Sequence, residues 1–238
     1  MKIRIKPARV LIYLLGMVTL ALGICLTTRA ALGVSPIISV AFCFSTITGM
    51  NIGDATFLWY STFVLLEILV HLTGLDRHGS KAGKAQKVLK DLLQLPLSLV
   101  FTRFMNLFTR FLPDFASLQG FWGSYAARIP VLLAAIVLTG IGISFSVNMR
   151  LIPNPGDGVV QALSDTIGKP MGLSKNIWDA SCITLTIVFS LVAAGRLIGI
   201  GLGTVICVIG VGRVVALFNR LTLPAQLKAA GMNEPSAK

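Results

Sequence analysis

Six long runs of apolar residues most constrain what this chain can fold into. The 238-residue chain is 55% hydrophobic and only 13% charged, whereas roughly a quarter of the residues in a typical soluble domain are charged. Each run has about 20 residues, the length that an α-helix needs to cross a hydrocarbon core. The runs are too long and too continuous for the strands of a transmembrane barrel. We therefore predict an all-α polytopic membrane protein with long helices at about 10–31, 55–75, 92–112, 129–149, 174–194 and 197–218.

The net charge of +12 does not indicate a nucleic-acid-binding protein. Most lysines and arginines lie at the ends of the apolar runs, as the positive-inside rule predicts, and no basic and aromatic residues alternate as they do in a platform that stacks bases. The four cysteines lie inside apolar runs without ligand spacing to histidine, so we expect no metal site and no cofactor. The expected partners are the lipid bilayer and a small molecule or ion, with a homodimer left open and no nucleic acid.

Two halves of the chain are related in sequence. When residues 9–72 are placed on 128–191 without a gap, 15 of 64 positions are identical, among them a proline, a tryptophan and three glycines. Shared membrane composition does not readily explain those five matches together. The pattern predicts a first membrane segment at 1–112, whose repeat begins at about residue 9 and which contains a basic cytoplasmic linker at 76–90. A connecting loop at 113–127 leads to the second repeat at 128–220. The cytoplasmic tail at 221–238 is polar and expected to be partly disordered.

Each repeat is expected to have three long helices and one short helix. Ser35-Pro36 and Asn154-Pro155 each place a capping residue before a proline at the first helical position, which predicts short helices at 36–48 and 155–167. Such a helix is about 20 Å long, too short to cross a membrane. If both helices re-enter, the chain has six spans and inverted repeats. The linker and both termini then lie on the cytoplasmic side of a bacterial inner membrane. If both cross, it has eight spans and parallel repeats, and the most basic loop lies outside; we favour the first arrangement.

The residues around the first short helix carry a family resemblance. Leu32-Gly33-Val34-Ser35-Pro36 followed by Gly49-Met50-Asn51-Ile52-Gly53 resembles the YczE/YyaS/YitT group of bacterial integral membrane proteins, and Asn154-Pro155-Gly156-Asp157-Gly158 fits the same scheme. The resemblance implies an inner-membrane protein connected with transport and names no substrate. Many members carry Trp-Asp after the first proline, where this chain has Ile37-Ile38. If the aspartate of that pair has a function in the family, Asp157 alone would provide it in this chain.

The starts of the two short helices form the candidate binding site. Free backbone amides and a partial positive charge at a helix start favour an anion or a carboxylate. Two arginines deep in apolar runs are candidate counter-charges, because a guanidinium suits carboxylate and phosphate; the alternative is a structural ion pair or a side chain that reaches the membrane surface. The candidate substrate-binding residues are Ser35, Pro36, Ser39, Asn154, Pro155, Gly156, Asp157, Gln161, Arg103 and Arg213.

Three further acids are candidates for coupling to a proton or another ion, namely Glu67, Asp165 and Asp179. No HExxH motif, nucleophile elbow or P-loop is present in the sequence, so we predict no catalytic residue and no enzyme. The leading hypothesis is a secondary transporter or channel-like protein for a small anionic or zwitterionic metabolite, with its site at the two short-helix starts near the membrane midplane. The alternative is a membrane scaffold or accessory subunit that transports nothing.

Overall fold

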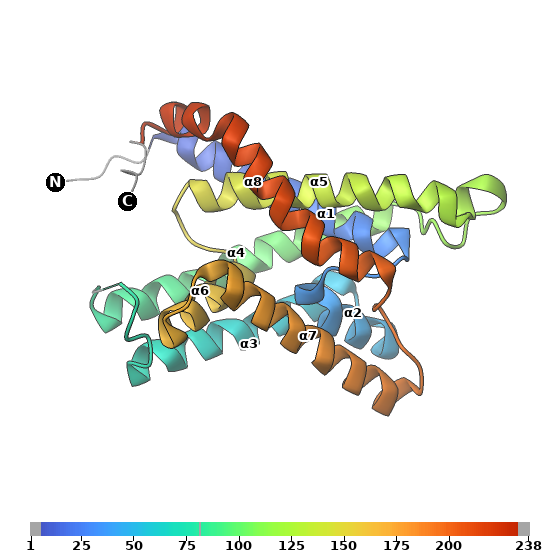
Figure 1. Cartoon of the computed structure of the whole chain (residues 1–238), viewed down its shortest axis with the longest axis horizontal. Helices are drawn as coiled ribbons and strands as arrows, with labels where there is room; N and C mark the ends of the chain where they lie inside the picture. Colours follow the sequence, from blue (N-terminus) through green and yellow to red (C-terminus); the bar gives the residue numbers. More distant parts are fainter. Residues whose placement is uncertain (1–5, 81, 233–238) are drawn as a thin grey trace.

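Every regular element in the described part of the chain is a helix. The computed structural model describes residues 6–80 and 82–232. Its elements are α1 (Pro7–Ala30), α2 (Pro36–Thr48), α3 (Ile52–Thr73), α4 (Lys84–Phe111), η1 (Gly120–Gly123), α5 (Tyr125–Asn148), α6 (Pro155–Ile167), α7 (Met171–Ala194) and α8 (Leu202–Ala230). Six helices (α1, α3, α4, α5, α7 and α8) are long and apolar enough to cross a membrane, and α2 is a shorter apolar helix. The prediction is confirmed to this extent: the chain is an integral multi-pass membrane protein with six candidate spans (Figure 1).

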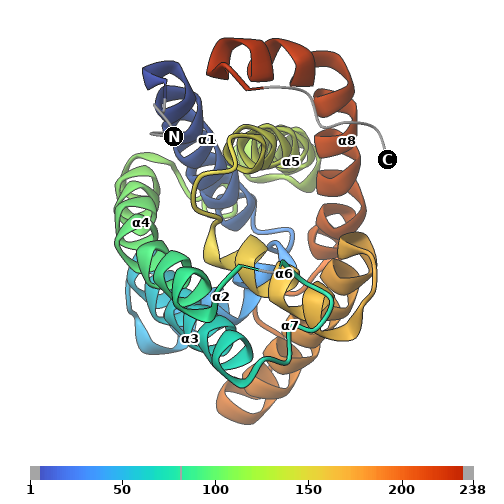
Figure 2. The same cartoon turned by 90° about the vertical axis from the view of Figure 1, so that its left-hand side faces the viewer.

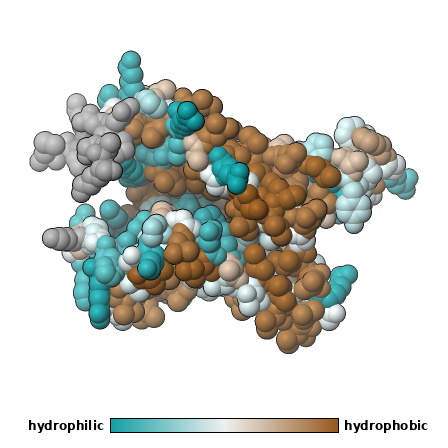
Figure 3. Space-filling model, in the orientation of Figure 1, coloured by the Kyte–Doolittle hydropathy of each residue, from teal (hydrophilic) through white to brown (hydrophobic). Residues whose placement is uncertain are grey.

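The outer surface of the helices is apolar. Leu65 is 65% exposed, Leu202 76% and Val192 83%. Figure 3 shows hydrophobic residues over the middle of the visible face and hydrophilic residues gathered toward its ends. A continuous apolar surface of this extent is unfavourable in water and matches the hydrocarbon core of a bilayer.

The loops gather at two opposite ends of the molecule (Figure 1). The linker end holds residues 74–80, 149–154 and 168–170; there the His78 amide donates to Asp165 O at 3.0 Å. The distal end holds residues 31–35, 112–124 and 195–201; there the Phe115 amide donates to Arg29 O at 3.1 Å. Each long helix runs from one end to the other, whereas α2 lies in the distal half and α6 in the linker half. This placement fits the arrangement with six spans.

Both short helices have the bounds that the sequence predicts. Each starts at a proline and ends before a glycine with positive φ, 73° at Gly49 and 65° at Gly168, a conformation that glycine adopts at little cost. Beyond each glycine the chain is held in the same way: Ser45 Oγ and Ser164 Oγ donate to the carbonyl oxygens five residues further on, at 2.6 and 2.7 Å. A proline at the start and a glycine after the end therefore fix the length of each helix.

Helix α4 begins earlier than predicted, at Lys84 instead of about residue 92. Its polar first turns pack against α3, because Asp91 Oδ2 lies 2.6 Å from His71 Nδ1 and Gln94 Nε2 donates to Glu67 Oε2 at 2.6 Å. A helix whose polar residues find partners needs no apolar run to be stable. Much of the predicted basic linker is therefore the first part of α4.

The remaining linker is anchored to α4. Lys87 forms an ion pair with Asp76, and Lys84 Nζ donates to Leu72 O at 2.9 Å. The ammonium of Lys87 holds the pKa of the Asp76 carboxyl below its usual range, so the pair stays charged at neutral pH.

Helix α8 continues to Ala230, so residues 221–230 of the predicted tail are helical; residues 233–238 lie outside the described part. Leu227 and Ala230 are buried, and Asn148 Nδ2 donates to Gln226 Oε1 at 3.0 Å. Figure 2 shows the end of α8 turning over α1 and α5. Proline inside a helix commonly produces such a bend, and α8 contains Pro224.

Helices α1 and α5 pack along each other at the centre of the molecule, with their backbones close together. A Cβ on Gly23 would lie 3.0 Å from Ala135 O, and a Cβ on Gly142 would lie 2.8 Å from Gly16 O. Positions 23 and 142, and positions 16 and 135, are each 119 apart. The two close contacts are therefore the same contact with the roles of the helices exchanged.

The ends of α1 and α5 exchange contacts in the same way. Arg9 Nε donates to Met149 O at 2.8 Å, and Arg128 Nη1 donates to Ala30 O at 3.5 Å. Positions 9 and 128, and positions 30 and 149, again differ by 119. Each arginine thus lies against carbonyl oxygens at the end of the other helix, which a helix end leaves without partners.

Candidate functional site

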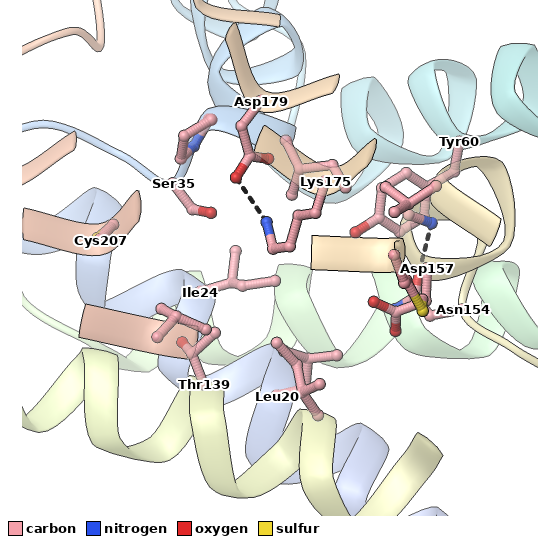
Figure 4. Close-up of a pocket in the computed structure, with 17 residues that line it drawn as sticks. Leu20, Ile24, Ser35, Tyr60, Thr139, Asn154, Asp157, Lys175, Asp179 and Cys207 are labelled. Carbon is pink, nitrogen blue, oxygen red and sulfur yellow. Dashed lines mark hydrogen bonds and ion pairs between the residues drawn. The ribbon is translucent and has the colours of Figure 1, made fainter. Parts of the chain in front are cut away.

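The starts of α2 and α6 meet at one pocket near the centre of the molecule (Figure 4). Gly156 on α6 faces Ile37 on α2, since a Cβ at Gly156 would lie 2.6 Å from Ile37 Cδ1. We call the cavity beside this contact the central pocket; its volume is about 60 Å³. The polar residues that line it are Ser35, Tyr60, Thr139, Asn154, Asp157, Lys175, Asp179 and Cys207.

The start of α6 uses its own cap. Asn154 Oδ1 accepts from the Gly156 amide at 3.2 Å, and Asn154 O accepts from the Asp157 amide at 2.8 Å. Pro155 has no amide hydrogen to offer. The expectation of free amides at this helix start is therefore wrong for its first turn, and the group that α6 offers to the central pocket is the Asp157 carboxylate.

The start of α2 has no side-chain cap. Ser35 makes no capping hydrogen bond, and its hydroxyl lines the central pocket. Trp59 Nε1 donates to Ile37 O at 3.0 Å, which fixes the first turn of α2 against α3. The uncapped first turn carries the partial positive charge of a helix start, so α2 supplies the side of the pocket that favours an anionic group.

The first turns of α7 add one ammonium and a second carboxylate. Lys175 Nζ donates to Asp179 Oδ2 at 2.6 Å. Within the described residues, Asp179 Oδ1 and Thr139 Oγ1 are buried without a hydrogen-bond partner, and both residues line the pocket. In the view of Figure 4, Lys175 extends between Ser35 on one side and Asp157 on the other. The pocket therefore offers groups for both signs of charge.

A second cavity lies between the linker end and the central pocket. This linker-end cavity has a volume of about 310 Å³ and is lined by residues of α3, α4, α6 and the linker, including Glu67, Asp91 and Lys87. Asp157 and Met171 line both cavities. These two side chains thus separate the small central pocket from the wider cavity.

The structure brings six of the predicted site residues to the central pocket: Ser35, Pro36, Asn154, Gly156, Asp157 and Asp179. Pro155 lies behind it, beside Tyr13 and Phe101. Ser39 is buried one turn along α2, where its hydroxyl lies 2.6 Å from Thr186 Oγ1.

Three other predicted residues line the linker-end cavity. Gln161 Nε2 donates to Asp165 Oδ1 at 2.7 Å. Glu67 is 2% exposed and packs against Gly158. These residues line the linker-end cavity and not the central pocket.

The two predicted counter-charges are not at the central pocket. Arg103 forms an ion pair with Asp54 at 2.7 Å near the distal end, and Arg213 is exposed on α8. Lys175 takes the place that these arginines were expected to fill. Its spacing of four residues from Asp179 on one helix is a sequence signal for an ion pair that points to this lysine.

Among the described residues, no group of three or more His, Cys, Asp or Glu side chains is placed to hold a metal ion.

Residues 7–220 match the model of a family of unknown function, DUF6198. No curated protein and no solved structure matches the chain.

Proposed function

We propose a function for this chain, which belongs to the DUF6198 family of unknown function: it is a secondary transporter or channel-like protein for a small solute. The solute is zwitterionic or anionic and binds in the central pocket. The resemblance of the short-helix motifs to the YczE/YyaS/YitT group supports a role in transport.

The single observation that carries this proposal is the mixed charge of one buried pocket at the meeting point of two short helices. A solute carboxylate fits the uncapped start of α2 and the ammonium of Lys175. A solute ammonium fits Asp157 or the unpartnered Oδ1 of Asp179. Because the pocket has two carboxylates and one ammonium, a zwitterion fits better than a simple anion.

The size of the central pocket indicates a closed site. A volume of about 60 Å³ accommodates a few water-sized groups, since one water needs about 10–15 Å³ on this measure. Access from the linker-end cavity requires Asp157 and Met171 to move, since both line the two cavities. A side chain that both closes the site and binds the solute is suited to gating.

The exchanged contacts support an inverted repeat. Contacts 23–135 and 16–142, and contacts 9–149 and 30–128, pair corresponding positions of the two halves across α1 and α5. Ile37 and Gly156 correspond to each other and meet directly, as residues on a two-fold axis must. Inverted repeats with binding sites at broken helices between them are a common architecture of secondary transporters.

The charge distribution supports an orientation. The linker, the start of α1 and the end of α8 lie at one end (Figure 1), and the linker region contains Arg77, Lys84, Lys87 and Lys90. The positive-inside rule places this end in the cytoplasm. We therefore propose a bacterial inner-membrane protein whose linker-end cavity opens to the cytoplasm.

Uptake into proteoliposomes tests the function. A panel of radiolabelled small zwitterions and carboxylates is offered to liposomes with the purified wild-type protein, Asp157→Asn or Asp114→Asn. Asp114 is exposed in the distal loop, so it is a matched control for the same chemical change. We expect a solute whose uptake falls at least tenfold in Asp157→Asn and is unchanged in Asp114→Asn.

Two outcomes would contradict the proposed function or its site. Neither uptake nor binding of any solute by folded wild-type protein would support the scaffold alternative. Equal uptake by Asp157→Asn and wild type would exclude the central pocket as the solute site.

A further inference from the structure

A cleft at the distal end gathers three arginines from two helices. It has a volume of about 600 Å³, within the range of small-molecule sites. The ends of α1 and α4 and the start of α3 form its walls, and its polar lining residues are Arg29, Asn51, Arg103, Asn106, Thr109 and Arg110. We call it the arginine cleft; it shares no residue with the central pocket.

The arginine cleft carries a surplus of positive charge. Arg103 Nη2 lies 2.7 Å from Asp54 Oδ1. In residues 6–80 and 82–232, neither Arg29 nor Arg110 has a carboxylate within ion-pair distance. Three guanidinium groups and one carboxylate leave a local charge of +2 (3 − 1).

The walls of the cleft are held in place. Asn106 Oδ1 accepts from the Gly53 amide at 2.9 Å, and a Cβ on Gly53 would collide with Asn106, so α3 starts directly against α4. Arg29 donates to Thr109 O, and its Nε is buried without a partner. Because contacts hold Arg29 and Arg103 before binding, these two side chains lose less entropy when an anion binds.

Helix ends explain only part of this arrangement. Arg29 and Arg110 lie in the last turns of α1 and α4, where a cation interacts favourably with the helix dipole. That interaction does not require both to converge on Arg103 and the amide of Asn51 in one cleft. Guanidinium groups beside side-chain amides are suited to several oxygen atoms of one anion.

We propose that the arginine cleft binds an anion through its carboxylate or phosphate oxygen atoms. The anion is either a soluble ion or the headgroup of an anionic phospholipid, since both present the same chemistry to the three arginines. This binding does not depend on the central pocket or on transport.

Binding to the full-length protein in nanodiscs tests this proposal and distinguishes the two sources. One set of nanodiscs contains only phosphatidylcholine and is titrated with inorganic phosphate. The other contains phosphatidylcholine and phosphatidylglycerol, and native mass spectrometry counts the retained phosphatidylglycerol. The variants are Arg110→Gln, Arg103→Gln and, as a control with the same loss of charge at the distal end, Arg196→Gln. Arg196 is exposed and lies outside the cleft.

We expect Arg110→Gln to weaken phosphate binding or phosphatidylglycerol retention at least fivefold, and Arg196→Gln to leave both unchanged. Arg110 makes no ion pair in the described part of the chain, so its loss should not unfold the protein; Arg103→Gln breaks the pair with Asp54 and serves as the second variant. Phosphate binding identifies a soluble anion and lipid retention identifies a headgroup. Binding of neither probe, or equal weakening by Arg196→Gln, overturns the proposal.

Discussion

At the scale of single residues, the central pocket owes its chemistry to differences between corresponding positions. Asp157 corresponds to Ile38, and Asp179 corresponds to Tyr60. Both carboxylates therefore come from the second half of the chain, while the uncapped helix start comes from the first. In the proposed function these differences give the pocket a direction: the start of α2 and Lys175 favour an anionic group, and Asp157 and Asp179 favour a cationic one.

Gly158→Ala tests the packing beside this pocket. A Cβ at Gly158 would lie 2.6 Å from Glu67 Oε2, and this oxygen accepts from Gln94 Nε2 at 2.6 Å, so moving the carboxylate away breaks that buried hydrogen bond. We expect a loss of about 1–3 kcal/mol in the free energy of unfolding, the usual cost of overpacking. Thermal unfolding in detergent measures it.

Two matched variants support the interpretation. Gly172→Ala places a Cβ where no atom lies within 4 Å and should be neutral or slightly stabilising. In a Glu67→Ala background the cost of Gly158→Ala should largely disappear, as expected for neighbours in contact. Wild-type stability of Gly158→Ala would contradict the described packing of α3 against α6.

The residues of the site could be predicted from the sequence only where neighbouring residues determine the local structure. Ser35-Pro36 and Asn154-Pro155 specify helix starts, and both starts reach the pocket. Arg103 and Arg213 were expected there because of their depth in apolar runs. Depth along a helix does not fix which neighbour a side chain meets, and Arg103 meets Asp54 across α3 and α4 instead.

At the scale of helices, the ends with strong signals were predictable and the ends without them were not. The bounds of α2 and α6 follow from proline and glycine. The polar start of α4 lacks such a signal, and tertiary contacts such as Gln94 with Glu67 decide it; α8 continues beyond its apolar run and ends only before Gly231, whose φ is 66°. Hydropathy therefore predicts the apolar part of a helix and misses a polar extension that packs on its neighbours.

Gly23→Leu and Gly142→Leu test the packing of α1 on α5. A Cβ at Gly23 would lie 2.6 Å from the backbone nitrogen of Thr139, and a Cβ at Gly142 would lie 2.5 Å from that of Leu20. Backbone atoms cannot rotate away, so we expect each variant to lose at least about 2 kcal/mol of stability. Gly212→Leu, at a position on α8 with no atom within 4 Å of a Cβ, is the control in the same unfolding assay. A large loss for only one of the two glycines would contradict the exchanged contacts.

At the scale of the whole molecule, the two halves share an element order but not all of their packing. Helix α3 packs along α4, whereas the corresponding α7 and α8 diverge from the loop that joins them (Figure 1). Alternating access requires two repeats that adopt different arrangements and exchange them. The sequence did not predict this difference, because the matched positions specify similar helices and leave their packing to the complete fold.

Labelling of single cysteines tests the orientation. Cys25, Cys43, Cys182 and Cys207 are all buried, so a bulky membrane-impermeant maleimide should react only with an introduced exposed cysteine. Six spans place an exposed cysteine at Ser80 in the cytoplasm and one at Asn51 outside. We expect Asn51→Cys to be labelled in intact cells and Ser80→Cys only after permeabilisation. Labelling of both from the same side would exclude this topology.

Solute protection of pocket thiols tests the central claim most directly. Ser35→Cys and Val160→Cys place one thiol near the start of each short helix in the central pocket, in a Cys207→Ala background because Cys207 also lines it. A small thiol reagent is applied with and without the solute that supports uptake. The account predicts that this solute protects both thiols over the same concentration range. Protection of only one thiol, or of neither, would contradict a solute site shared by the two helix starts.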